Sequence, residues 1–279
     1  MENNNYLDLR KLVTEKFDKA GIDEIADFDW ICCEVTGKKR SELPFIKEFS
    51  NKELERINNA VEKRLNHIPL AYIFGKTNFY GYDFIVNEHV LIPRLDTEIL
   101  IEKLIEEINS RSERVDVLDI GTGSGAIAIT LSKETGSNVT AVDISEHALE
   151  IAKKNAELNG ANVAFIQSDL FENISNIKID IIVSNPPYIE TGVIATLDDE
   201  VKLHEPILAL DGGEDGLDFY RKIVMEAPKH LKQCGKLFFE IGFNQAESVS
   251  ILMKDKFKNV SVIKDYLGND RIVVGEKYD

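Results

Sequence analysis

The chain has 279 residues and a net charge of −16, with 33 Lys and Arg residues against 49 Asp and Glu residues. This acidic balance argues against a protein that grips duplex nucleic acid, because such proteins gain affinity by neutralising phosphates with basic side chains. The length allows one large domain or two smaller ones, and the 43% hydrophobic content is ordinary for a globular protein.

Membrane, secreted and metal-binding proteins are disfavoured as well. No apolar stretch approaches the ~18 residues of a membrane span, and residues 1–5 show no basic segment followed by an apolar one. The three cysteines, Cys32, Cys33 and Cys234, have neither the spacing of a disulfide framework nor that of metal ligands. We therefore expect a cytoplasmic protein that holds no metal.

Residues 1–75 carry the signals of a small helical bundle. Apolar side chains recur at helical spacing over residues 6–17 and 28–35. Ser50 is a plausible N-cap for a third helix, because the run 53–65 that follows it has its apolar residues on one face. No strand pattern interrupts these stretches, so we predict a separate helical domain.

Residues 76–95 differ in composition and predict a connector. The run from Phe79 to Val86 is aromatic and β-branched, which is typical of a short β-hairpin. A helix is predicted after the connector, from about Thr97 to Ile108.

From Val115 onward, strand and helix patterns alternate. Seven apolar runs predict strands: Val115–Ile120, Val139–Val142, Val163–Ile166, Ile179–Val183, Leu237–Ile241, Val260–Ile263 and Arg271–Val274. Helices are predicted between them, at Ala126–Lys133 and Glu146–Leu158 among others. Such a pattern implies a Rossmann-like α/β domain with a mostly parallel seven-stranded sheet, covered on both faces. The predicted division of the chain has three parts: 1–75, 76–95 and 96–279.

A glycine-rich turn joins the first predicted strand to a helix: Asp119, Ile120, Gly121, Thr122, Gly123, Ser124 and Gly125. Glycines at alternate positions let the backbone approach a ligand closely. About 20 residues further on, the second strand ends at Asp143, whose carboxylate can accept hydrogen bonds from ribose hydroxyls. A strand, glycine turn, helix, strand and acid in this order predict a nucleoside site.

The spacing of the glycines favours one nucleoside over others. Dinucleotide sites prefer G-x-G-x-x-G, whereas the turn here is G-x-G-x-G and has Asp119 just before it. A carboxylate there would oppose a pyrophosphate and attract the ammonium of S-adenosylmethionine, which carries no phosphate. After the third strand, Asp169 and Phe171 offer a polar acceptor and an aromatic face to adenine. Phe171 also suits a core or rim position.

The segment Asn185-Pro186-Pro187-Tyr188 follows the fourth predicted strand. Two prolines end the strand abruptly and present carbonyl acceptors without competing N–H donors. Asn185 and the Pro186 carbonyl can accept both hydrogens of an –NH2 group, and Tyr188 can lie against a planar substrate. A strand-ending turn with a packed tyrosine is the simpler interpretation of these residues alone. An exocyclic amine of a nucleic-acid base and a side-chain amide fit the motif equally well.

The glycine turn and the Asn-Pro-Pro-Tyr segment together resemble class I methyltransferases that act on planar nitrogens. Further segments resemble the HemK/PrmC family: Pro69 to Gly75, Phe79, Gly81, Phe84, Val86, Val90 to Arg94, Glu205-Pro206, Gly212-Gly213, Tyr220 and Glu240 to Gly242. One departure is Leu95-Asp96-Thr97-Glu98, where the family usually has Pro-Glu-Thr-Glu.

The resemblance implies an N-terminal helical domain that recognises release factors, a β-hairpin connector and a seven-stranded class I methyltransferase sheet. It implies methyl transfer from S-adenosylmethionine, with S-adenosylhomocysteine as product, to the glutamine amide in the Gly-Gly-Gln loop of class 1 peptide-chain release factors. The positions that it assigns to the cofactor are Gly121, Thr122, Gly123, Ser124, Gly125, Asp143, Phe171 and Asn185, and those assigned to the glutamine are Asn185, Pro186, Pro187 and Tyr188.

The predicted function is therefore a cytoplasmic protein-glutamine methyltransferase, expected to be a monomer that meets neither a membrane nor nucleic acid directly. A nucleic-acid amino methyltransferase, acting on adenine N6, cytosine N4 or guanine N2, is the alternative. A nicotinamide oxidoreductase is disfavoured by the glycine spacing. A non-catalytic binding module is disfavoured by the intact glycines and Asn185.

Overall fold

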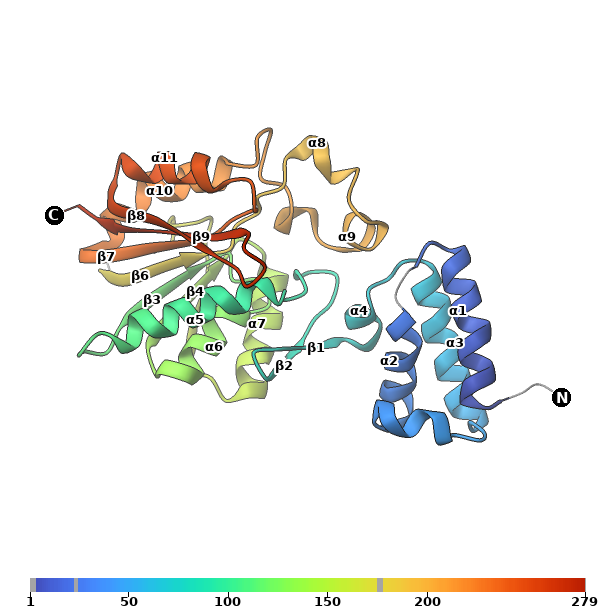
Figure 1. Ribbon diagram of the computed structural model, residues 1–279. Helices are drawn as coiled ribbons and strands as arrows, with labels where there is room; N and C mark the ends of the chain where they lie inside the picture. Colours follow the sequence, from blue (N-terminus) through green and yellow to red (C-terminus); the bar gives the residue numbers. More distant parts are fainter. Residues whose placement is uncertain (1–3, 23–24, 175–177, 279) are drawn as a thin grey trace. The chain divides into compact units, whose positions relative to one another are not determined.

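A computed structural model describes residues 4–22, 25–174 and 178–278. The chain forms two compact units, which are considered one at a time (Figure 1). The first comprises Met1–Gly75 with Asp198–His204, and the second comprises Lys76–Leu197 with Glu205–Asp279.

The first unit is helical in its described residues, as the apolar spacing predicts. Its elements are α1 (Tyr6–Lys19), α2 (Ile25–Thr36), the 3-10 helix η1 (Arg40–Phe45), α3 (Asn51–Leu65), α4 (Leu70–Phe74) and α9 (Asp199–His204). Ser50 caps α3 as expected: its hydroxyl accepts from the Glu53 N–H, and the Glu53 carboxylate accepts from the Ser50 N–H. Phe28, Ile31 and Leu43 are fully buried and form the centre of the unit.

The segment 198–204 joins this unit although it lies far along the sequence. The Arg64 guanidinium on α3 lies 2.7 Å from the Glu200 carboxylate on α9. The His204 ring contacts the Asn66 carbonyl at 2.9 Å. No periodic pattern in so short a segment predicts these contacts, and the predicted range 96–279 assigned residues 198–204 to the sheet domain.

The second unit begins with the predicted hairpin, β1 (Lys76–Phe79) and β2 (Tyr82–Ile85), paired antiparallel. Asn155 attaches the hairpin to the sheet domain. Its buried side chain accepts from the Ile85 N–H at 2.6 Å and donates to the Ile85 and Ser124 carbonyls, each at 2.9 Å. One amide therefore connects the hairpin with the turn that contains the glycines.

The sheet confirms the predicted α/β class and the seven, mostly parallel strands. In spatial order they are β5 (Val163–Gln167), β4 (Asn138–Asp143), β3 (Asp116–Ile120), β6 (Ile179–Ser184), β7 (Leu231–Glu240), β9 (Asp270–Lys277) and β8 (Phe257–Lys264). Strand β9 runs antiparallel to both of its neighbours. From β3 the chain builds β4 and β5 on one side, then returns to place β6 on the other, so a crevice opens at the carboxyl ends of β3 and β6.

Helices cover both faces of the sheet, which explains the continuous apolar runs in its strands (Figure 1). One face carries α5 (Asp96–Asn109), α6 (Ala126–Thr135) and α7 (Glu146–Asn159); the other carries α10 (Asp218–His230) and α11 (Ala246–Lys254). The loop after β6 contains α8 (Thr191–Ile194), α9 and the 3-10 helix η2 (Ile207–Ala209). Among the described residues, no helix combines the length and apolar character needed to cross a bilayer.

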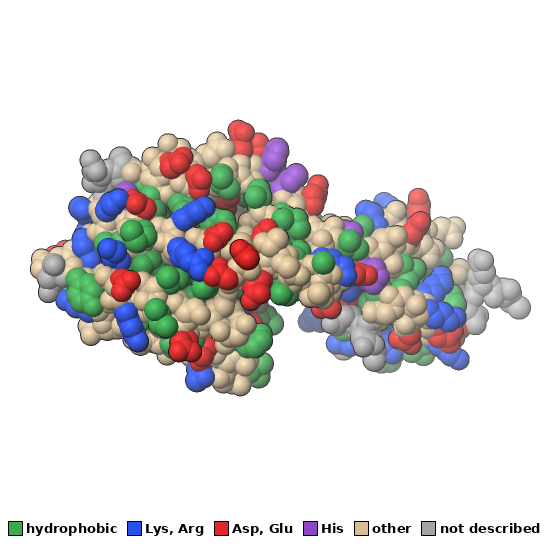
Figure 2. Space-filling view, turned by 90° about the horizontal axis from the view of Figure 1, so that it is seen from above, with side chains coloured by type: hydrophobic (Ala, Val, Ile, Leu, Met, Phe, Trp, Pro, Cys, Tyr) green, Lys and Arg blue, Asp and Glu red, His purple; other side chains and the backbone are tan. Residues whose placement is uncertain are grey.

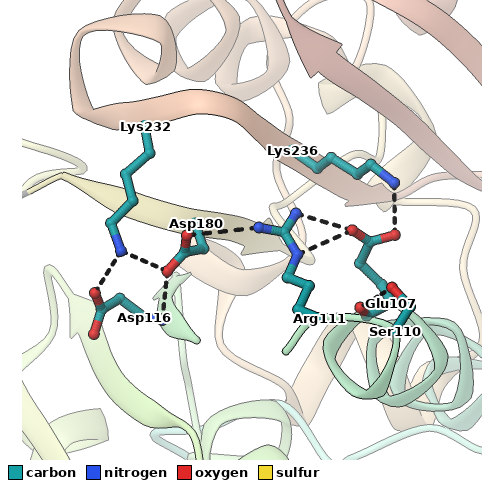
Figure 3. Close-up of polar contacts among 7 residues, drawn as sticks. All are labelled: Glu107, Ser110, Arg111, Asp116, Asp180, Lys232 and Lys236. Carbon is teal, nitrogen blue, oxygen red and sulfur yellow. Dashed lines mark hydrogen bonds and ion pairs between the residues drawn. The ribbon is translucent and has the colours of Figure 1, made fainter. Parts of the chain in front are cut away.

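The amino-terminal edge of the sheet, opposite the crevice, is held by a chain of alternating charges (Figure 3). Lys232 contacts Asp116 at 2.8 Å and Asp180 at 2.7 Å, and so bridges β7, β3 and β6. Arg111 lies between Asp180 and Glu107, and Lys236 contacts the other oxygen of Glu107 at 2.6 Å. The network anchors helix α5 to three strands at the edge away from the crevice.

Candidate active site

A cavity of about 520 Å³ lies at the carboxyl ends of the parallel strands, within the second unit. This volume falls in the ~300–1,000 Å³ range of small-molecule sites. Its walls are mainly apolar. Some of its polar groups come from the ends of β3, β4, β5 and β6, and others come from the segment before α5 and from the helices, such as Arg94 and Lys222. Residues from predicted site segments on its wall are Gly121, Thr122, Gly123, Ser124, Asp143, Asp169, Asn185, Pro186 and Pro187.

The glycine turn forms one wall of the cavity. The N–H groups of Gly121 and Thr122 donate to the Val142 carbonyl at 2.9 and 3.0 Å, which ties the turn to β4. Gly125 has a φ of +84°, and an added Cβ would lie 2.8 Å from the Ile129 Cδ1 atom and 3.2 Å from the Ala152 Cβ atom. Only glycine permits this backbone together with the close packing of α6 on α7.

Two carboxylates serve the glycine turn differently. Asp143 lies on the cavity wall, accepts from the Gly123 N–H and the Ser145 N–H at 2.9 Å each, and has its pKa raised by burial. Asp119 is fully buried behind the turn and accepts from the Thr122 hydroxyl at 2.6 Å. Burial raises the pKa of Asp119 to about 7. Asp119 is absent from the described cavity wall, and the hydrogen bond that it accepts comes from Thr122, which does line the cavity. Its attraction of a cofactor ammonium stays a prediction.

The loop after β5 supplies a polar edge. Ser168, Asp169 and Leu170 line the cavity, and the Ser168 hydroxyl fixes the loop by donating to the Leu170 carbonyl at 3.0 Å. Phe171 is buried and stacks on the His230 ring, with ring centroids 4.6 Å apart. The structure thus places Leu170 on the described cavity wall and Phe171 in the core beside it.

Asn185 stands at the carboxyl end of β6, beside the glycine turn. The preceding Ser184 donates its hydroxyl to the Ile120 carbonyl at 2.7 Å, which holds the ends of β6 and β3 together. The Asn185 Nδ2 group donates to the Thr97 hydroxyl at 3.4 Å. With Nδ2 turned toward Thr97, the Oδ1 atom is left as the acceptor for a ligand N–H group.

The backbone of Pro187 and Tyr188 is braced by residues that the sequence analysis did not assign to the site. Gln245 donates from Nε2 to the Tyr188 carbonyl at 2.9 Å and accepts from the Gly242 N–H at 3.0 Å. A Cβ at Gly212 would lie 2.8 Å from the Pro187 carbonyl oxygen and from the Tyr188 Cα atom. The Gly212-Gly213 pair, noted only as part of the resemblance, was the available signal for this close approach.

Tyr188 packs against the apolar core between the sheet and helices α10 and α11, and it is absent from the described cavity wall. Burial raises the pKa of Tyr188 to about 12, so its hydroxyl is neutral at physiological pH. Its contact with a planar substrate stays a prediction, while the structure shows Tyr188 as support for the turn.

Comparison with known sequences decides the family. The PrmC N-terminal domain family matches residues 8–75, and the methyltransferase small domain family matches residues 94–200. The release factor glutamine methyltransferase of Bacillus subtilis is 44% identical over 248 residues, which cover 85% of this chain and 86% of that protein. The Fusobacterium nucleatum enzyme of the same name is 42% identical over 282 residues, covering 97% and 78%.

The chain belongs to the release factor glutamine methyltransferase family.

Solved structures of methyltransferases share the fold of this family member. A methyltransferase from Pyrococcus furiosus superposes with a TM-score of 0.55 at 21% identity, covering 83% of this chain and 100% of that one. The hMettl16 catalytic domain, crystallised with the MAT2A 3′UTR hairpin 6, gives a TM-score of 0.57 at 18% identity, covering 83% and 84%. The predicted class I methyltransferase architecture is confirmed.

The structure also shows what surrounds this chain's departure from the usual Pro-Glu-Thr-Glu of the family. Asp96 forms an ion pair with Arg271 on β9 at 3.0 Å, so the shorter carboxylate still has a partner. Arg94 lines the cavity and donates to both oxygens of Glu205 at 2.6–2.7 Å. Arg94 and Asp96 therefore have separate partners, and Thr97 is placed beside Asn185.

Proposed function

We propose that this protein transfers a methyl group from S-adenosylmethionine to the side-chain amide nitrogen of a glutamine, in the Gly-Gly-Gln loop of class 1 peptide-chain release factors. Family membership supports the substrate class. The observation that carries the proposal is the orientation of Asn185, whose Nδ2 group is engaged by Thr97 and whose Oδ1 atom is left to accept from an amide.

The residues around the cavity fit S-adenosylmethionine. Positions 121 and 123 are bare of Cβ atoms, so the turn can lie against a ligand. Asp143 keeps acceptor capacity for ribose hydroxyls beyond the two N–H groups it binds. Asp169 offers a polar acceptor beside the apolar Leu170 on the same wall. When bound there, the cofactor supplies an electrophilic methyl group on a sulfonium.

The protein's own task is to hold a weak nucleophile in position. An amide nitrogen is a poor nucleophile because its lone pair is delocalised, so the approach must be held near ~3–3.5 Å and in line. The Asn185 Oδ1 atom and the Pro186 carbonyl would accept the two N–H groups of the glutamine amide. These contacts keep the hydrogens out of the line of attack and stabilise positive charge that develops on nitrogen.

A strong general base is not required for this reaction. The substrate nitrogen loses a proton only after methylation makes it acidic, and water can accept that proton. The segment 185–188 accordingly contains neither His nor Lys. The catalytic contribution of the chain is orientation and charge stabilisation rather than proton abstraction.

Charge favours a protein substrate over the alternative, a nucleic-acid base. The chain carries a net charge of −16. On the face that Figure 2 shows, the drawn acidic and basic side chains of the sheet unit are interspersed rather than gathered into one broad basic surface. Long-range attraction of a polyanion is weak under these conditions.

A competition assay tests the proposal. The purified protein is incubated with methyl-labelled S-adenosylmethionine, a class 1 release factor, and either tRNA or duplex DNA in the same tube. Label is expected in the release factor, and a release factor whose loop glutamine is changed to asparagine should stay unlabelled. Label in the nucleic acid, or equal label in the asparagine variant, would overturn the proposed substrate.

A further inference from the structure

Glu240 is the last residue of β7, the strand next to the one that Asn185 follows. Strands β6 and β7 are parallel neighbours in which Ser184 pairs with Phe239, so the next residues along each strand, Asn185 and Glu240, are also neighbours. Only 2% of Glu240 is exposed. A carboxylate removed from water in this way is costly unless hydrogen-bond donors face it.

Thr97 and Asn185 both face this carboxyl group. Hydrogen bonding from Thr97 and from Asn185 lowers the pKa of Glu240, against the larger effect of burial, which raises it. Asn185 Nδ2 also reaches the Thr97 hydroxyl at 3.4 Å. When the Thr97 hydroxyl donates a hydrogen bond to Glu240, its oxygen is left to accept one from Asn185. The three side chains then form one hydrogen-bond network with a fixed direction.

The direction of these hydrogen bonds matters because the asparagine amide can rotate by 180° and exchange its oxygen and nitrogen with little change of shape. If Asn185 were flipped, its Nδ2 group would face the substrate amide, donor against donor. We propose that Glu240 and Thr97 are positioning residues that hold Asn185 with Oδ1 toward the substrate. This inference rests on the proposed role of Asn185 and adds the two groups that set its orientation.

The second carboxylate oxygen of Glu240 is consistent with a role in orienting Asn185. This Oε2 atom has no hydrogen-bond partner among residues 4–22, 25–174 and 178–278. A role in packing alone would be served by an apolar side chain, without the cost of a buried unpaired oxygen. The retained carboxylate is explained if an acceptor without a proton is needed beside Thr97 and Asn185.

Ionisation of Glu240 provides a readout that a structural role would not move. Burial raises its pKa to about 7; the charged groups that act on it are Arg271, which lowers the pKa, and Asp96, which raises it. Tyr188 and Tyr220 are neutral neighbours, and the Tyr220 hydroxyl on α10 donates to the Glu240 backbone carbonyl at 2.9 Å. Ionised Glu240 only accepts hydrogen bonds. Protonated Glu240 can donate one to Asn185 Oδ1, which would allow the amide to flip and turn Oδ1 away from the substrate. The rate of methylation should therefore fall as the pH drops through this pKa.

The test uses the full chain with Thr97→Val, Thr97→Ser and Glu240→Gln, measured with a release factor as methyl acceptor. Thr97→Val and Glu240→Gln are expected to lower kcat about 10-fold, with a smaller change in S-adenosylmethionine affinity, since the glycine turn and Asp143 that would hold the cofactor are untouched. Thr97→Ser, which keeps the hydroxyl, should stay near wild type. Glu240→Gln should also lose the acidic fall in rate.

Thr130→Val is a matched control, because it removes another fully buried hydroxyl in the same unit, on α6. It should keep wild-type kcat. The inference is overturned if Thr97→Val keeps wild-type kcat, if Thr97→Ser is as impaired as Thr97→Val, or if Glu240→Gln retains the acidic limb. If Glu240→Gln fails to fold, the Thr97 pair decides the question. Failure of the proposed function is distinct, because the wild type itself would then leave the release factor unlabelled.

Discussion

Gly212→Ala is the most direct structural perturbation of the acceptor turn that leaves every side chain of the cavity intact. The added Cβ would lie 2.8 Å from the Pro187 carbonyl oxygen and from the Tyr188 Cα atom, and 2.9 Å from the Gly216 Cα atom. Ordinary contact between carbon atoms needs ~3.5–4.0 Å, so the turn must move by roughly 0.7 Å or more. The three obstacles belong to the backbone, which cannot swing aside as a flexible side chain can.

The shift should affect both stability and turnover. Overpacking of this kind costs about 1–3 kcal/mol in the free energy of unfolding. Because a 1 Å misplacement of reacting groups can cost ~100-fold in rate, kcat should fall about 10–100-fold. Steady-state methylation of a release factor and urea unfolding measure the two effects. S-adenosylmethionine affinity should change less than kcat, since the glycine turn at 121–125 is untouched.

Gly192→Ala is the matched control for this substitution. Gly192 lies in α8 of the same loop, has no positive φ, and has nothing within 4 Å of its added Cβ. Alanine at such a site stabilises by about 0.4–1 kcal/mol or is neutral, and kcat should be unchanged. A Gly212→Ala protein with wild-type stability and kcat would refute the claim that this close approach fixes the turn.

Two further perturbations test the support of the site. Asn155→Ala leaves the N–H and carbonyl of Ile85 and the carbonyl of Ser124 without their partner. The free energy of unfolding, measured by urea titration, should fall by about 3 kcal/mol. A loss under about 1 kcal/mol would contradict the bridging role of Asn155. Lys232→Met should cost only about 0.5–1 kcal/mol at pH 7, because Lys232 and Asp116 are each more than one-third exposed. A hydrogen bond from Lys232 is the main cause that lowers the pKa of Asp116 in the folded chain, so this stabilisation is present above the unfolded pKa of ~3.9 and is lost as the pH falls through the lower folded pKa. The gap in melting temperature between wild type and Lys232→Met should narrow below about pH 4, and a gap that stays constant would count against the ion pair.

The sheet strands could be predicted from sequence because each is a continuous apolar run that both faces of the sheet bury. All seven predicted runs correspond to β3–β9. The glycine turn and Asn185 were equally visible, since their residue types are unusual at the ends of such strands. Strand order placed Asn185 beside the glycine turn, as the topology of an open α/β sheet requires.

The supporting groups could not be predicted because their contacts are long-range and their residue types are common. Thr97 and Glu240 meet Asn185 from α5 and β7, and no local spacing signals such a meeting. Phe171 shows a related limit: an aromatic residue after a strand suits a ligand wall or the core equally well, and the structure stacks it on His230. Hydrophobic pattern identifies elements, whereas side-chain direction depends on the assembled fold.

Single-turnover methylation of a release factor tests the role of Asn185 directly. Wild type and Asn185→Ala are each loaded with labelled S-adenosylmethionine, mixed with the release factor, and the labelled peptide is sequenced by mass spectrometry. Label is predicted on the side-chain nitrogen of the loop glutamine, and Asn185→Ala should form it at least ~100-fold more slowly than wild type when both proteins are saturated with S-adenosylmethionine. Equal rates for the two proteins, or label on any other residue, would contradict this prediction.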